Sequence, residues 1–171
     1  NSLENDLVLT SGEQVTIGLL SAILKKKGIK STPLLGWQIP IITDSSYEKA
    51  KILNIDVKNV EFLFKSSDVI VLAGFQGVNT DGFITSLGRG GSDTTAVAIA
   101  AALKAERCDI YTDVEGIFTS DPNLVKNARK IPKVSFEEML EMSSMGAKVL
   151  HTRSVELAMK NNLTLQVLSS L

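Results

Sequence analysis

Apolar runs of strand length alternate with stretches of helical periodicity along this chain. The runs expected to be strands are 31–35, 69–74, 83–87, 109–113 and 165–168. The stretches expected to be helices are 17–28, 57–64, 94–105, 135–146 and 153–161. Short apolar runs indicate buried strands, whereas spacings of three and four indicate helices. The alternation predicts an α/β fold with a mostly parallel central sheet.

Two local signals mark where elements begin or turn. Ser135 and Glu138 have the spacing of a capping box, so a helix is expected to start there. Asn79–Gly82 has the composition of a tight turn, which predicts one antiparallel hairpin within the otherwise parallel sheet.

The N-terminal segment is expected to form a strand, a turn and a helix. Val8–Leu9 is a short apolar strand candidate, and Ser11–Glu13 interrupts it. From Ile17 onward the apolar residues recur at helical spacing as far as Gly28. Under this prediction Glu13 lies directly after a strand, in the first turn of a helix.

Composition and charge are those of an ordinary globular protein. The chain has 171 residues, of which 44% are hydrophobic and 22% charged, and its formal net charge is -1. This length predicts a single domain, 1–171, with a hydrophobic core large enough to stabilise the fold. Because basic and acidic residues are balanced, the overall charge does not predict nucleic acid or an anionic membrane as a partner.

The cysteine and histidine content of the chain bears on its cellular location and on metal binding. The single cysteine, Cys108, cannot form an internal disulfide, which is typical of a cytoplasmic protein. No apolar run is expected to span a bilayer. The single histidine, His151, has no second histidine or cysteine at ligand spacing, so no zinc site is predicted, and it is interpreted as a helix-entry residue.

The most informative motif is the glycine-rich stretch Leu87–Asp93. Its glycines can present backbone N–H groups to an anion at the start of the following helix. Arg89 can grip a carboxylate and Asp93 can face an ammonium group, so the loop suits an amino acid. An ordinary strand-to-helix turn, with Ser92 as the helix cap, is the alternative.

Other polar residues follow predicted strands, where ligands of α/β proteins gather. Glu13 could accept from an ammonium group or merely suit a helix dipole. Thr112 and Asp113 could hold a nucleotide, or Asp113 could cap the loop that follows. Lys148, in an apolar context, either extends to solvent or meets a buried anion such as phosphate.

Three motifs in order carry a resemblance to a known family. They are Leu-Gly-Arg-Gly-Gly-Ser-Asp-Thr-Thr at 87–95, Ile-Tyr-Thr-Asp-Val-Glu-Gly-Ile-Phe-Thr-Ser-Asp-Pro at 110–122, and Gly-Ala-Lys-Val-Leu at 146–150. The sequence resembles the aspartate kinases of the amino-acid kinase superfamily over essentially its whole length. The resemblance implies a three-layer αβα sandwich.

The same resemblance implies phosphoryl transfer from ATP, with Mg²⁺, to the side-chain carboxylate of L-aspartate, giving 4-phospho-L-aspartate. The implied aspartate-binding residues are Glu13, Arg89, Gly90, Gly91, Ser92 and Asp93. The implied nucleotide-site residues are Thr112, Asp113, Phe118, Asn123 and Lys148, of which Lys148 and Asp113 are the catalytic pair. Family members commonly have Tyr at the place of Phe118 and Arg at that of Asn123.

Some family features have no counterpart in this sequence. They are the opening strand with its Lys-Phe-Gly-Gly motif, whose lysine stabilises the transferring phosphoryl group, and the regulatory ACT domains. The fold is therefore expected to be incomplete at the N-terminus, and the isolated chain to turn over little. A homo-oligomer is implied, partly through those segments. A non-catalytic binding or assembly module, and a kinase for another acidic substrate, are the alternatives.

Overall fold

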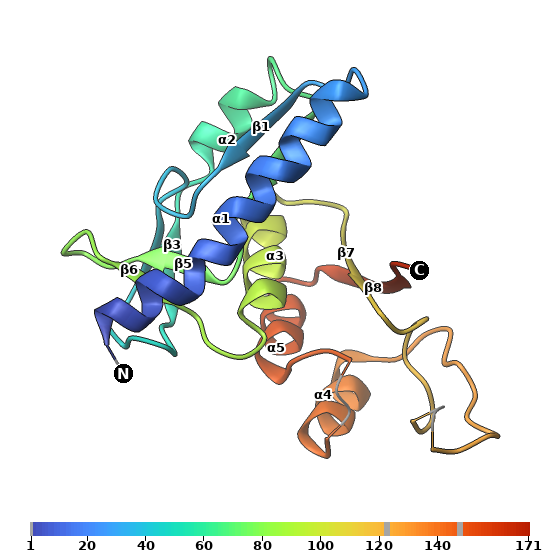
Figure 1. Cartoon of the computed structure of the whole chain (residues 1–171). Helices are drawn as coiled ribbons and strands as arrows, with labels where there is room; N and C mark the ends of the chain where they lie inside the picture. The colour runs from blue at the N-terminus through green and yellow to red at the C-terminus, as the bar shows by residue number, and fades with distance from the viewer. Residues whose placement is uncertain (1, 122–123, 147–148) are drawn as a thin grey trace.

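The computed structural model describes residues 2–121, 124–146 and 149–171 (Figure 1). Its helices are α1 (Leu3–Lys26), α2 (Lys58–Leu63), α3 (Gly91–Ala102), α4 (Phe136–Ser144) and α5 (Thr152–Lys160). Its strands are β1 (Ser31–Leu34), β2 (Ile41–Thr43), β3 (Ile52–Ile55), β4 (Val69–Leu72), β5 (Gln76–Val78), β6 (Ile84–Ser86), β7 (Arg107–Thr112) and β8 (Thr164–Ser169). Most of the predicted elements are confirmed within a few residues.

The strands of the described residues form three short sheets rather than one continuous sheet. β1 pairs with β4 and β7 with β8, both in parallel. The third sheet has the order β3-β2-β5-β6, in which β2 and β5 are parallel. The predicted hairpin is confirmed as β5 and β6, whereas the antiparallel pair of β2 and β3 was not predicted.

Alternating side chains of β4 place this strand between two helical layers. Val71 and Ala73 pack against Ile17 of α1 on one face. Ile70 and Leu72 point the other way, into a cluster that includes residues of α2 and α3. Because successive side chains of a strand point to opposite faces, this pattern defines a helix–sheet–helix sandwich (Figure 1). The predicted α/β fold is therefore confirmed.

A second core joins α3, α4 and α5 to β7 and β8. Val97 of α3 and Val155 of α5 are fully buried at its centre. The capping box of α4 is confirmed, because Ser135 Oγ accepts from the Glu138 amide at 3.2 Å and Glu138 Oε2 accepts from the Ser135 amide at 2.9 Å. These hydrogen bonds lower the pKa of Glu138, which keeps the cap charged.

The helix predicted from Ile17 onward is confirmed, but the strand and the turn predicted before it are wrong. The segment is a single helix, α1, of 24 residues, and no strand forms at Val8–Leu9. The residues that face the body are Asp6, Thr10, Ile17 and Ser21, a helical spacing in which the buried positions are mostly small and polar. Apolar periodicity alone misses such a face, and its tertiary contacts outweigh the helix-weakening effect of Gly12.

The outward face of α1 is unusually apolar. Its exposed large hydrophobic side chains are Leu7, Val8, Leu9, Val15, Leu19, Leu20 and Ile23, each between 45% and 70% exposed. By length and composition α1 also meets the criterion for a membrane span, which the sequence prediction did not foresee. In the structure, however, α1 packs along β1, β4 and β6. Its inward face therefore belongs to the globular body.

Candidate active site

The buried carboxylate of Asp6 ties α1 to the end of β6, directly before the glycine-rich loop. Its oxygens accept from the Ser86 amide at 2.8 Å, from Ser86 Oγ at 2.6 Å and from the Glu48 amide at 3.0 Å. A fully buried carboxylate needs such donors, because an unsatisfied one would be costly. Sequence reasoning missed Asp6, because a carboxylate in the first turn of a helix is also favourable at an exposed position.

The glycine-rich loop has a backbone conformation that favours glycine. Gly88 and Gly90 have φ values of 70° and 69°, in the left-handed region. The Gly91 amide donates to the Gly88 carbonyl at 2.9 Å, which closes a tight turn. The loop is thus a turn of defined shape, as the sequence predicted.

Neighbouring segments also leave no room for side chains at these glycines. A Cβ at Gly88 would lie 2.6 Å from the Glu48 carbonyl oxygen, and one at Gly90 would lie 2.5 Å from His151 Cβ. A Cβ at Gly91 would lie 2.8 Å from the Phe75 ring. Both the torsions and the close packing therefore require glycine here.

The N-terminus of α3 has no side-chain cap. Gly90 is the N-cap residue, and no side chain of the described residues caps the helix through it. Ser92 is exposed within the first turn instead, so the alternative in which Ser92 caps the helix is wrong. Uncapped N–H groups at a helix start can bind an anion, which agrees with the ligand-binding interpretation of this loop.

Arg89 and Asp93 occupy different environments on the two sides of the turn. Arg89 is exposed, and its guanidinium has no hydrogen bond or ion pair with any residue that the structure describes. Asp93 is half-buried, and burial raises the pKa of its carboxyl, although the nearby His151 opposes this shift. A free guanidinium and a carboxylate held apart from it suit a ligand that carries both charges.

Glu13 lies within α1 and not at the end of a strand, so its predicted position is corrected. It shares the inward face with Thr10 and Ile17. The Thr10 carbonyl accepts from Gln76 Nε2 at 3.2 Å, and Ile17 packs on Ala73. Glu13 therefore faces the connection between β4 and β5.

That connection in turn contacts the glycine-rich loop. A Cβ at Gly74 would lie 3.4 Å from Ser92 Cα, and the Phe75 ring lies against Gly91. The Phe75 amide also donates to Thr95 Oγ1 at 3.1 Å. Of the residues predicted for the amino acid, Glu13, Gly91 and Ser92 thus lie around one connection, although no hydrogen bond or ion pair joins Glu13 to the loop among the described residues.

Thr112 and Asp113 lie at the carboxyl end of β7. Because β7 returns along α3, this end approaches the N-terminal side of α3. Thr112 Oγ1 donates to Asp113 Oδ1 at 3.1 Å, and the Thr112 carbonyl accepts from the Ser170 amide at 2.8 Å. Asp113 is exposed, so its carboxylate is accessible to a ligand.

The segment after β7 forms a short antiparallel contact with itself. Phe118 pairs with Lys130, the Ile131 amide donates to the Ile117 carbonyl at 2.8 Å, and the Thr119 amide donates to the Arg129 carbonyl at 2.9 Å. Phe118 is thereby held against the segment around Lys130. Asn123 and Lys148, two further predicted nucleotide-site residues, lie outside the described residues.

The start of α5 supplies two residues that touch the glycine-rich loop. His151 is the N-cap of α5 and packs against Gly90, which confirms its interpretation as a helix-entry residue. Arg153 Nη2 donates to the Leu87 carbonyl at 2.6 Å and to the Arg89 carbonyl at 2.8 Å. Sequence reasoning missed Arg153, because nothing in its local sequence indicates a partner so far along the chain.

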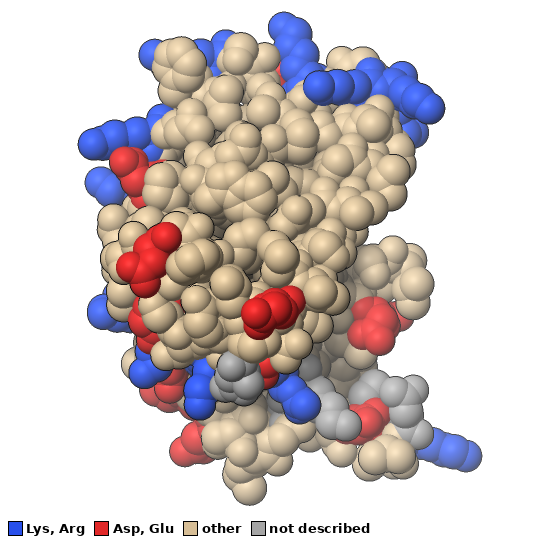
Figure 2. Space-filling model, turned by 60° about the vertical axis from the view of Figure 1, so that its left-hand side comes forward, with Lys and Arg blue, Asp and Glu red and all other residues tan. Residues whose placement is uncertain are grey.

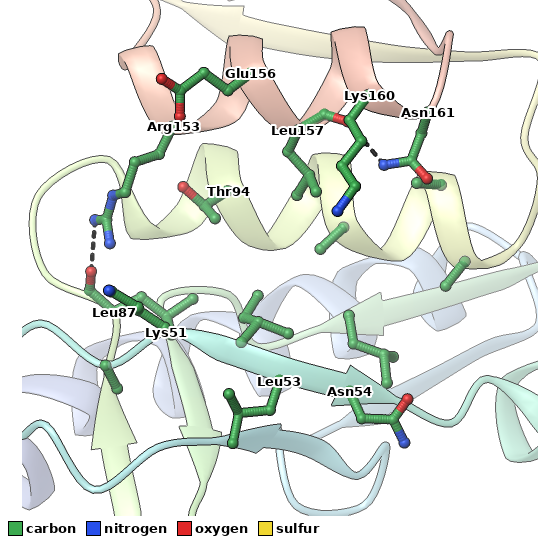
Figure 3. Close-up of a pocket in the computed structure, with 16 residues that line it drawn as sticks. Lys51, Leu53, Asn54, Leu87, Thr94, Arg153, Glu156, Leu157, Lys160 and Asn161 are labelled. Carbon is green, nitrogen blue, oxygen red and sulfur yellow. Dashed lines mark hydrogen bonds between the residues drawn. The ribbon is translucent and has the colours of Figure 1, made fainter.

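A separate cavity of about 570 Å³ lies between β3, α3 and α5 (Figure 3). Its floor is apolar and includes Leu53, Ala98 and Leu157, while Lys51 and Lys160 contribute cations. Arg153 reaches from this cavity towards the Leu87 carbonyl. Of the predicted site residues that the structure describes, none lines the cavity.

A metal site built by protein ligands alone is not found among the residues that the structure describes, which contain no group of three His, Cys, Asp or Glu side chains suited to a metal. Mg²⁺ bound with a nucleotide usually needs only one or two carboxylates, because phosphate oxygens and water complete its shell. Asp113, exposed at the end of β7, fits that requirement.

The chain also matches a known protein family. The model of the amino acid kinase family matches residues 1–169, so the chain belongs to this family. The chain is 55% identical over 167 residues to the aspartate kinase of Pseudomonas putida and 53% identical over 168 residues to an aspartokinase of a Bacillus strain.

The chain also matches solved structures of aspartate kinases. Aspartate kinase from Synechocystis matches with a TM-score of 0.83 and 46% identity over 98% of this chain. E. coli aspartokinase III, in complex with aspartate and ADP, matches with a TM-score of 0.82 and 34% identity over 96% of this chain. The chain spans 41% of each of the two relatives named above, and 27% and 38% of these two structures.

Proposed function

We propose that this chain forms most of the catalytic domain of an aspartate kinase. In the reaction, an oxygen of the aspartate side-chain carboxylate forms a bond to the γ-phosphorus of ATP. The bond between that phosphorus and the bridging oxygen of ADP breaks, which gives 4-phospho-L-aspartate and ADP. No covalent enzyme intermediate is needed, because positioning and charge stabilisation carry such a transfer.

The glycine-rich loop is the observation that carries this proposal. The Arg89 guanidinium has no protein partner among the described residues and would bind the α-carboxylate, together with Gly90, Gly91 and the exposed Ser92 at the uncapped start of α3. Asp93 and Glu13 would face the substrate ammonium group. Opposite charges presented in this way select an amino acid over a simple dicarboxylate.

The nucleotide half is proposed at the carboxyl end of β7. Thr112 and Phe118 would contact the nucleotide, and the Asp113 carboxylate would hold Mg²⁺ together with the phosphate oxygens. Asn123 and Lys148 are assigned to the same half from the resemblance alone. Mg²⁺ would neutralise charge on the transferring phosphoryl group, and the Lys148 ammonium would do the same.

Self-association is also proposed, through the outward face of α1. This face presents seven large apolar side chains, from Leu7 to Ile23, whereas its inward face is mostly polar. A contiguous exposed apolar surface of this kind marks an interaction site. Figure 2 shows a wide area without charged side chains on one face of the molecule, bordered by Lys and Arg and also by Asp and Glu. A cytoplasmic location is proposed as well, because Cys108 is a buried, unpaired thiol.

Calorimetry on the 171-residue chain tests the amino-acid site. We expect saturable binding of L-aspartate, weaker binding of L-glutamate, and separate binding of MgATP. Arg89→Ala is expected to weaken aspartate binding by roughly ten- to hundredfold, since it removes a charge-assisted pair. Arg107→Ala is the control, because Arg107 is an exposed arginine of β7 that pairs with Asp109. Equal aspartate affinity in both variants would contradict the proposal.

A further inference from the structure

Arg153 joins α5 to the backbone of the glycine-rich loop, which lies between β6 and α3. From α5, its Nη2 donates to the carbonyls of Leu87 and Arg89, at 2.6 Å and 2.8 Å. The two carbonyls flank Gly88, whose φ is 70°. One guanidinium nitrogen therefore binds the backbone on both sides of Gly88, and Figure 3 shows the bond to Leu87.

The loop needs such an external constraint. Gly88, Gly90 and Gly91 have the largest conformational freedom of any residue type, so fixing them in one conformation is entropically expensive. The hydrogen bond from the Gly91 amide to the Gly88 carbonyl is a local contact. It closes the turn but does not fix the position of the turn relative to the rest of the fold. Charge-assisted bonds from an arginine are about twice as strong as neutral ones, so they place it more firmly.

The helix that carries Arg153 is itself firmly packed. Ser154, Val155 and Ala158 of α5 are fully buried in the core formed with α3 and α4. His151, at the start of the same helix, packs against Gly90. The loop is thus held from α5 at two places, by hydrogen bonds to the carbonyls of Leu87 and Arg89 and by van der Waals contact between His151 and Gly90.

We propose that Arg153 is a positioning residue, which fixes the glycine-rich loop in the conformation that presents Arg89 and the start of α3 to the amino-acid substrate. Arg153 acts only through the loop backbone and does not touch the substrate. This inference rests on the proposed function for the identity of the substrate. The mechanical part, that Arg153 orders the loop, stands on the two hydrogen bonds alone.

The test compares three variants of the protein. Arg153→Ala removes the clamp, and Arg153→Lys keeps the charge but lacks the planar fork. Lys160→Ala is the matched control, because Lys160 is an exposed cation of the same helix that lines the same cavity. Circular dichroism and thermal melting identify any variant that fails to fold.

Ligand binding gives the first readout. We expect Arg153→Ala to raise the dissociation constant for aspartate by roughly ten- to hundredfold, as misplaced binding groups do. Arg153→Lys should recover part of this loss, and the affinity for MgATP should change less than about twofold in every variant. In the active enzyme the KM for aspartate should rise while the KM for ATP does not. A uniform loss of both affinities would show a merely structural role and overturn the proposal.

Amide exchange gives a second readout that needs no substrate. The Gly91 amide should exchange at least about tenfold faster in Arg153→Ala than in the wild type or Lys160→Ala, as expected for loss of a hydrogen bond to a charged group. Unchanged exchange at Gly91 would overturn the clamp. Absence of aspartate binding by the wild type, with faster exchange in the variant, would refute the proposed function and leave the clamp supported.

Discussion

The two halves of the candidate site are held in different ways. The glycine-rich loop is enclosed by α5, by the segment around Glu48 and by Phe75, and Asp6 anchors the strand before it. Thr112 and the exposed Asp113, by contrast, contact mainly each other and the neighbouring strand β8. The amino-acid half is therefore built into the tertiary structure before a ligand arrives.

This difference matches the two ligands proposed for the site. Aspartate is small and must be told apart from similar amino acids, which requires fixed groups. MgATP brings its own charges and metal, so a few accessible side chains at a strand end can hold it. Substitutions in the first half should therefore change both stability and binding, while those in the second should change binding alone.

The largest effect is expected from Gly90→Ala. The new Cβ would sit at a φ of 69° and lie 2.5 Å from His151 Cβ, so we expect a loss of about 2–4 kcal/mol in the free energy of unfolding, with loss of aspartate binding. Gly82→Ala is the control, since Gly82 has a φ of 84° but nothing within 4 Å of an added Cβ. Urea unfolding measures the stability of both variants. Similar losses in the two variants would show that the contact with His151 contributes nothing.

Asp6→Asn should have the next largest effect. The Asp6 carboxylate accepts from two backbone amides and one hydroxyl, and asparagine replaces one of its accepting oxygens with a donating NH₂ group. We therefore expect a destabilisation of about 2–3 kcal/mol, measured by urea unfolding, together with weaker aspartate binding. Asp81→Asn, in an exposed turn, is the control and should change stability by less than about 0.5 kcal/mol. If Asp6→Asn bound aspartate normally, α1 would not support the loop.

Asp113→Asn tests the nucleotide half. We expect the free energy of unfolding to change by less than about 0.5 kcal/mol, because the side chain is exposed. Binding of MgATP should fall by roughly tenfold or more, since the carboxylate that would meet Mg²⁺ is lost. Calorimetry with MgATP and with L-aspartate separates the two halves. Weakened aspartate binding with normal MgATP binding would reverse the assignment.

Asp93→Asn should have a small effect on stability, and this effect should depend on pH. Burial raises the pKa of Asp93, so the folded state binds its proton more tightly than the unfolded state. Stability is therefore lost as pH rises through the raised pKa, and the asparagine variant should be slightly more stable at neutral pH. The advantage should disappear below the ordinary pKa of Asp. Urea unfolding across this range checks the sign, and a variant less stable at neutral pH would contradict it.

The same variant should lose aspartate affinity. Asp93 would then weaken folding in order to present a charge to the ligand, a common relation between stability and function. Calorimetry at neutral pH measures this loss. Unchanged affinity would remove Asp93 from the group that faces the substrate ammonium.

Local patterns determined a large part of the fold. The capping box of α4, the turn at Asn79–Gly82 and the apolar run of β4 each depend on residues close in sequence, so their positions were predictable. The glycine-rich loop was predictable for the same reason, because positive φ values and a free helix start are properties of a short segment.

Only the tertiary structure decided the identity of α1, the strand β3 and the residues that hold the site. Asp6 meets Ser86 across 80 positions and Arg153 meets Leu87 across 66. No local propensity encodes such pairs, because each side chain would be equally acceptable at a solvated surface. The sequence by itself determined the chemistry of the glycine-rich loop. The packing of α1 and α5 decided that this loop is held in place, since only distant partners can remove the conformational freedom that its glycines introduce.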